Sequence, residues 1–143
     1  MSDPNPAAVA RLAGIMRGEL PCPPMWETVP IRLLEVAAGV IRMETQADQR
    51  HINALGTVHG GFIATVLDTA LGLTVYISID AEARHTTVDL AVKMLKPVPL
   101  ATPLEVETSL VHVSRSIGVS QGVLRDAAGT VYAHGTTTCH IRR

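Results

Sequence analysis

Two hydrophobic patterns divide the chain. Residues 60–76 are apolar around nearly the whole circumference of a helix, which predicts one long helix buried on nearly all sides. Further along the chain, apolar and polar positions alternate with a period of two. This alternation predicts strands, which turn-forming sequences separate from one another, over residues 87–95, 104–113, 117–125 and 130–141.

The first part of the chain predicts a helix and then an extended connection. Asn5 followed by Pro6 is typical of a helix start, and Gly18 is expected to end this helix after about residue 17. Prolines recur between residues 21 and 24, where they disfavour both helix and sheet. We therefore expect residues 1–28 to add an N-terminal helix and a Pro-rich extended connection.

The remaining elements indicate the fold class. Residues 29–45 favour strands with a break at Gly39, and residues 48–56 predict a polar loop. The chain thus has one long helix and five to six strands, mostly antiparallel because the later connections are short. A single apolar helix beside so large a sheet predicts an α+β fold in which the sheet wraps the helix, with residues 1–143 as one domain.

Composition restricts the partners of the protein. Hydrophobic residues make up 47% of the 143 residues and charged residues only 17%. Twelve basic and thirteen acidic residues give a net charge of −1, so we expect no nucleic-acid partner. A small domain with so many apolar and so few charged residues is expected to form a homo-oligomer, which covers part of the apolar surface.

The apolar stretch of residues 60–79 is long enough to suggest a membrane span. Asp68 lies near its middle, however, where an acid costs roughly 2.5–3.5 kcal/mol on insertion scales. We therefore expect a buried helix and no membrane partner. The sequence shows no signal-peptide pattern, and its two cysteines form no metal or redox motif, so a cytoplasmic protein is expected.

The chemically informative stretch surrounds the start of the long helix. A polar loop containing Asn53 and Gly56 leads into His59, Gly60 and Gly61. Glycines there permit a tight turn and a close ligand approach, and the first-turn N–H groups of a helix are unpaired. Together with the helix dipole, these N–H groups favour the binding of a developing oxyanion.

Asp68 is a carboxylate in an otherwise apolar helix. An unpaired buried carboxylate is costly, so Asp68 is expected to face a partner group, water or a cleft. Gly72 lies one turn later on the same face and would leave space beside the carboxylate.

The spacing of these residues resembles that of a known family. The pattern consists of Asn53, Gly56, the His59-Gly60-Gly61 sequence, and Asp68 nine residues after the histidine. It is similar to that of the hotdog-fold acyl-CoA thioesterases of the phenylacetic acid degradation (PaaI-type) family, over about residues 31–141. The resemblance implies a hotdog fold and hydrolysis of an acyl-CoA, with an aryl, arylacetyl or medium-chain acyl group, to free acid and CoA. It implies neither a metal nor an organic cofactor.

The resemblance also implies a role for each matching catalytic residue. Asp68 matches the catalytic acid, which acts as nucleophile or as general base on water. The Gly60 N–H matches the group that polarises the thioester carbonyl. Asn53 matches a residue near the thioester, and His59 one that supports the loop or the leaving group. Thr87 falls where the family often has a hydroxyl that orients the water.

The substrate-binding positions implied by the resemblance are Gly61 and Gly56. In such enzymes two chains pair so that their sheets join, and each site draws residues from both chains. The resemblance therefore implies a dimer or a dimer of dimers, with sites at the dimer interface.

Other interpretations remain open at the level of sequence. Asn53 also fits an Asx turn and His59 a loop anchor, so a structural role accounts for either. A hotdog hydratase or dehydratase and a non-catalytic acyl-CoA-binding protein are alternative functions. The Gly118-Val-Ser120-Gln-Gly122 sequence fits the nucleophile motif of serine esterases, but Ser120 lies in a strand pattern and we expect it to be structural.

Overall fold

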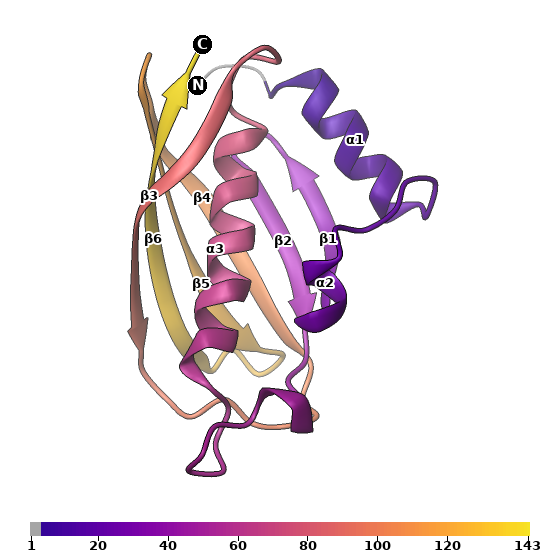
Figure 1. Cartoon of the computed structure of the whole chain (residues 1–143), viewed down its shortest axis with the longest axis vertical. Helices are drawn as coiled ribbons and strands as arrows, with labels where there is room; N and C mark the ends of the chain where they lie inside the picture. Colours follow the sequence, from indigo (N-terminus) through magenta and orange to yellow (C-terminus); the bar gives the residue numbers. More distant parts are fainter. Residues whose placement is uncertain (1–3) are drawn as a thin grey trace.

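One helix and one sheet dominate the fold of residues 4–143, which the computed structural model describes. The sheet has the order β1-β2-β4-β5-β6-β3, every neighbouring pair is antiparallel, and it bends around helix α3, Gly60–Tyr76 (Figure 1). The strands are β1 Ile31–Ala37, β2 Val40–Thr45, β3 Arg84–Met94, β4 Leu104–Val113, β5 Ile117–Asp126 and β6 Val131–Arg142. This arrangement confirms the predicted α+β fold. Residues 1–3 of the predicted domain lie outside the described residues.

Helix α3 buries one broad face and not its whole circumference, which corrects the prediction. The buried residues are Phe62, Ile63, Val66, Leu67, Ala70, Leu71, Thr74 and Val75. The sheet covers only this side of the helix, so the opposite strip, which includes Asp68, Gly72 and Tyr76, is only half-buried. None of the helices in residues 4–143 is long and apolar enough to cross a membrane.

The N-terminal helix α1, Pro6–Met16, begins as the sequence predicts. The Asn5 side chain accepts hydrogen bonds from the backbone N–H groups of Ala7 and Ala8, at 3.1 Å each. The Asn5 backbone N–H donates to the carbonyl oxygen of Ile77, 2.7 Å away, just beyond the end of α3. This bond fastens α1 to the central helix.

Two short helical turns and one strand boundary differ from the prediction. The expected extended connection contains a helical turn, α2 Met25–Thr28, which buries Trp26; Pro24 precedes it, where a helix needs no N–H. The predicted polar loop contains a 3₁₀ turn, η1 Gln49–His51. Strand β3 begins at Arg84, before the predicted residue 87, because its polar first residues pair with β6 although they lack apolar alternation.

Candidate functional site

His59 caps the start of α3. Its Nδ1 accepts a hydrogen bond from the Gly61 N–H at 2.7 Å, and its carbonyl oxygen accepts from Phe62 at 3.0 Å. A Cβ on residue 61 would lie 2.8 Å from this Nδ1, so the glycine allows the imidazole to fold back. The Gly61 N–H is therefore not free, which corrects the expectation for that group. Within residues 4–143 the Gly60 N–H has no acceptor.

The loop before His59 is closed by Asn53. The Asn53 Oδ1 accepts from the backbone N–H groups of Leu55 and Thr57, at 2.9 and 3.1 Å, and its Nδ2 donates to Thr57 Oγ1 at 3.0 Å. Gly56 has φ +82°, a left-handed conformation that favours glycine and lets the loop reverse direction. Asn53 thus makes the Asx turn that the structural interpretation predicts, and retains one amide hydrogen.

His51, which sequence reasoning missed, anchors this loop to the rest of the fold. Its buried imidazole accepts from the Asp48 N–H at 2.9 Å, while Nε2 lies 2.7 Å from the carbonyl oxygen of Thr28. Because Nδ1 accepts, Nε2 is the nitrogen that donates to Thr28. The carbonyl of His51 accepts from the His59 N–H at 2.7 Å, so the anchor reaches the helix start. The spacing of Asp48 and His51, which resembles a capping box, was the signal available in the sequence.

Asn53 and Gly60 lie on the wall of one cavity of about 390 Å³. Its other lining residues are Thr57, Val58, Ile63, Met94, Leu95, Lys96, Pro97 and Val98. Met94 packs over Gly60 so closely that a Cβ on residue 60 would lie 2.9 Å from its Cε. The cavity therefore places an unpaired N–H beside a mostly apolar space at the start of a helix.

Asp68 forms a second group, with Thr87 of β3. The Thr87 hydroxyl donates to Asp68 Oδ1 at 3.3 Å, and the same oxygen of Thr87 lies 3.8 Å from the Sγ of Cys139. Burial raises the pKa of the Cys139 thiol, so this side chain is neutral. Sequence reasoning missed a second residue, His85, whose Nε2 lies 3.8 Å from the position that a Cβ on Gly72 would occupy.

The two groups are separate within one chain. Gly60 and Asp68 are eight residues apart on α3, which corresponds to about 12 Å along a helix axis. One reacting carbonyl cannot contact both residues of the same chain at that separation. The structure therefore joins Asn53 to Gly60 and Asp68 to Thr87, but it leaves these two half-sites apart.

Ser120 does not form a serine-esterase site. Its side chain is fully buried in β5, and its hydroxyl donates to the carbonyl oxygen of Leu71 at 2.9 Å. The structural interpretation of this motif is confirmed. Within residues 4–143, no three His, Cys, Asp or Glu side chains are grouped so that they could hold a metal ion.

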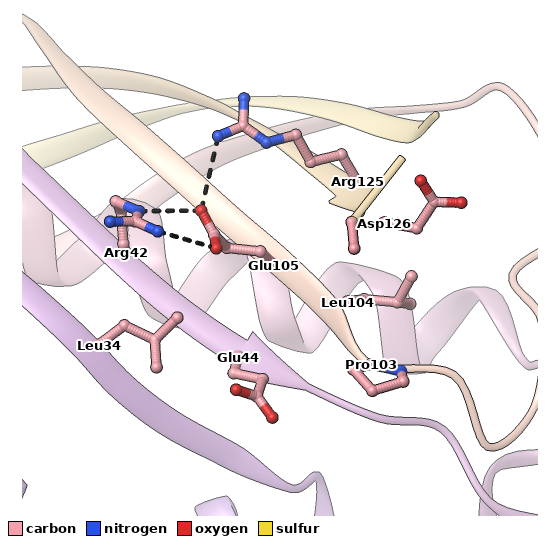
Figure 2. A pocket seen from close by; sticks show the side chains of 9 residues that line it. Leu34, Arg42, Glu44, Pro103, Leu104, Glu105, Arg125 and Asp126 are labelled. Atoms are coloured by element: carbon pink, nitrogen blue, oxygen red, sulfur yellow. Dashed lines mark hydrogen bonds and ion pairs between the residues drawn. The ribbon is translucent and has the colours of Figure 1, made fainter. Parts of the chain in front are cut away.

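A further hollow, of about 380 Å³, lies on the face of the sheet away from α3 (Figure 2). Glu105 there accepts hydrogen bonds from Arg42, at 2.9 and 3.0 Å, and is 3.5 Å from a guanidinium nitrogen of Arg125. These hydrogen bonds lower the pKa of Glu105 and raise that of Arg42. The charges are satisfied by one another, and none of the predicted site residues lines this hollow.

The chain is similar to a family of known proteins. The model of the thioesterase superfamily matches residues 55–133, which are more than half of the chain and include Gly60, Asp68 and Thr87. Human acyl-coenzyme A thioesterase 13 is 25% identical over 112 residues, which are 78% of this chain and 79% of that protein.

Solved structures have the same architecture. The phenylacetic acid degradation-related protein of Ralstonia eutropha superposes with a TM-score of 0.80 at 26% identity, covering 90% of this chain and 98% of that one. A mutant of the phenylacetic acid degradation protein PaaI from Thermus thermophilus has a TM-score of 0.75 at 20% identity, over 82% and 98% of the two chains. At that identity the second match bears on the fold alone, and it agrees with the first that the fold is the hotdog fold.

Proposed function

This chain belongs to the thioesterase superfamily and is a thioester hydrolase, and from that premise we propose that it is an acyl-CoA thioesterase with Asp68 and Gly60 at its reaction centre. The observation that carries the assignment is the hydrogen bond from Thr87 to Asp68, at 3.3 Å, on the half-buried face of an otherwise apolar helix. This bond leaves the second carboxylate oxygen available to water or to a thioester.

Each half-site supplies one part of the reaction. The free N–H of Gly60, at the positive end of the α3 dipole, stabilises the negative charge that develops on the thioester oxygen. Asp68 either removes a proton from the water that attacks the carbonyl carbon, or attacks that carbon itself and is released from the acyl group by water. In both routes the C–S bond breaks, the acyl group leaves as a carboxylic acid, and CoA leaves as the thiol.

Three residues support these two groups in the proposed site. Thr87 orients Asp68 and the attacking water through its hydroxyl. His59 holds the first turn of α3 in place through Gly61, so that the Gly60 N–H points into the cavity. Asn53 shapes the loop with Gly56 and offers its remaining amide hydrogen to the thioester region.

We propose that two chains form each site, in a homodimer built on β3. Within one chain, Gly60 and Asp68 are about 12 Å apart along the helix axis, too far to contact the same carbonyl. A site that uses both residues therefore needs Gly60 from one chain and Asp68 from the other. Strand β3 is one of the two edges of the sheet, and Val88 on it is 62% exposed. Twofold pairing of two such edges would join the sheets and cover this apolar surface.

The oligomer is tested by light scattering on the purified chain. The wild type is expected to be a dimer or a dimer of dimers, and Val88→Lys, which places a charge on the edge strand, is expected to dissociate it and abolish turnover. An active wild-type monomer would contradict the shared site. Glu82→Gln, an exposed change on the segment before β3, is the matched control.

The proposed substrates are acyl-CoA esters with aryl, arylacetyl or medium-length aliphatic acyl groups. The named relatives act as thioesterases or belong to phenylacetic acid degradation, which supports this range. The apolar walls of the cavity beside Gly60, such as Ile63 and Met94, accept either kind of chain.

The activity is tested by following free thiol release with a thiol reagent over a panel of these acyl-CoA esters. Asp68→Asn is expected to lower kcat by roughly 10²–10⁴-fold with folding retained, whereas Glu82→Gln leaves it unchanged. Binding without thiol release would indicate an acyl-CoA-binding protein. A change in the acyl chain with no free thiol would indicate a hydratase or dehydratase.

A further inference from the structure

His85 is a titratable residue close to Asp68 that the reaction proposed above does not use. It precedes Thr87 by two residues on β3, so both side chains face α3. The Nε2 of His85 lies 3.8 Å from the position that a Cβ on Gly72 would occupy, and its ring centroid is 6.0 Å from that of Tyr76. His85 therefore lies about one helical turn beyond Asp68.

Gly72 leaves a gap between the imidazole and the carboxylate. Asp68 and Gly72 are four residues apart on α3, so their positions lie one above the other, about 6 Å apart along the axis. Apart from the neighbouring residues 71 and 73 and the nearby helix backbone, the His85 Nε2 is the one described atom within 4 Å of a Cβ built on Gly72. The imidazole therefore lies against the position on α3 that follows Asp68 by one turn and carries no side chain.

Asp68 supplies the charge that acts on His85. Burial lowers the pKa of His85, and the negative charge of Asp68 opposes part of this effect. Tyr76 on α3 lies beside the imidazole, and the buried thiol of Cys139 on β6 lies beside Thr87. The residue opposite His85 on β6 is the apolar Ile141. Burial therefore favours the neutral imidazole, and the Asp68 carboxylate is the charged group that opposes this effect.

We propose that His85 is a positioning residue for Asp68, and that its protonation turns the carboxylate away from the substrate. While the imidazole is neutral, Asp68 keeps one oxygen on Thr87 and presents the other to the thioester or water. Once the imidazole gains a proton, the ion pair formed across the gap over Gly72 draws that oxygen toward His85 and makes it less basic. This inference rests on the proposed function, since it concerns the same site.

The test is the pH dependence of kcat and kcat/KM between pH 4 and 8. Wild type is expected to lose activity as the pH falls through the lowered pKa of His85, about tenfold for each pH unit below that midpoint. His85→Gln cannot gain the proton, so its acid limb moves to lower pH. Gly72→Ala fills the gap at ordinary contact distance and moves the limb in the same direction. His140→Gln, at an exposed histidine of β6, is the matched control.

A second measurement does not depend on turnover. In the intact chain, the imidazole resonances of His85 report its titration, and Asp68→Asn is expected to lower the pKa of His85 because it removes the opposing charge. An unchanged His85 pKa in Asp68→Asn, or an acid limb that stays in place in His85→Gln, would overturn the proposal. If wild type hydrolyses no thioester at any pH, the proposed function fails, and the resonance measurement alone decides the pairing of His85 with Asp68.

Discussion

The hydroxyl of Thr87 donates to Asp68 Oδ1 across 3.3 Å and so joins β3, an edge strand of the sheet, to the middle of the central helix. The hydrogen bond fixes one carboxylate oxygen, and the helix backbone fixes the rest of the side chain. Because β3 is also the strand proposed to pair with a second chain, the orientation of Asp68 and the formation of the dimer depend on the same element.

Thr87→Val removes this hydrogen bond while keeping the shape of the side chain. It is expected to lower kcat about tenfold, which corresponds to the loss of one hydrogen bond to a charged group, with little change in KM. Thr87→Ser keeps the hydroxyl and should retain most of the turnover. Thr86→Val, an exposed change on the same strand, is the control. A Thr87→Val enzyme with wild-type kcat would show that the hydroxyl does not orient the acid.

His59 has a role in the helix cap that is separable from a role in the chemistry. His59→Ala removes the acceptor of the Gly61 N–H and is expected to lower the free energy of unfolding by ~1 kcal/mol, measured by urea titration. Asparagine is a favoured N-cap, so His59→Asn should restore the stability. If Nδ1 acts only through the cap, His59→Asn also restores turnover; a stable but inactive His59→Asn enzyme would assign chemistry to the imidazole.

The ion pairs of Glu105 predict that the free energy of unfolding depends slightly on pH in the acidic range. Arg42 lowers the pKa of Glu105 in the folded chain, so the pair stabilises the fold above the ordinary glutamate pKa. That contribution is lost as the pH falls through the lowered pKa. Glu105→Gln is therefore expected to be less stable than wild type by ~0.5 kcal/mol at pH 7, since the pair is partly exposed, and the difference is expected to be smaller at pH 2. Urea unfolding at both pH values checks this; an equal difference at both would contradict it.

Much of the fold was predictable from local patterns. The sheet buries one broad face of α3, and α3 in turn buries one face of the later strands. Most buried positions are apolar, so both elements are visible in the sequence, as a continuous apolar stretch and as an alternation. The first residues of β3 are polar, because an edge strand needs little apolar surface, and so they left no such trace. The sequence also did not predict that one strip of α3 is only half-buried. Apolar residues on that strip look the same in the sequence as the apolar residues of the core.

The candidate site was predictable only in part. Four of the site residues lie close together in sequence, and their spacing alone identified them as candidates: Asn53, His59, Gly60 and Asp68. His85 and Cys139 come near Asp68 through the pairing of β3 with β6, a long-range contact that no local pattern reveals. The bond that occupies the Gly61 N–H depends on the rotamer of His59, which the sequence does not determine.

Gly60→Pro tests the oxyanion site without breaking the helix. Gly60 is the first residue of α3, where proline is tolerated, and His59 before it has the extended ψ of 136° that a following proline requires. The change removes the one N–H proposed to polarise the carbonyl and is expected to lower kcat by roughly 10²–10³-fold. The flexible end of Met94 must shift to make room. Unchanged far-UV circular dichroism checks the helix, and wild-type turnover in this variant would remove Gly60 from the mechanism.

Mixing Gly60→Pro with Asp68→Asn tests whether two chains share each site. A mixed dimer has one site with neither change, because the Asp68→Asn chain supplies an intact Gly60 and the Gly60→Pro chain an intact Asp68. Random exchange of subunits makes half of the dimers mixed, so about a quarter of wild-type turnover should return after the two inactive proteins are unfolded and refolded together. Each variant refolded alone is the control and should stay inactive. If every site lies within one chain, each chain of the mixture carries one lesion, and refolding together restores nothing.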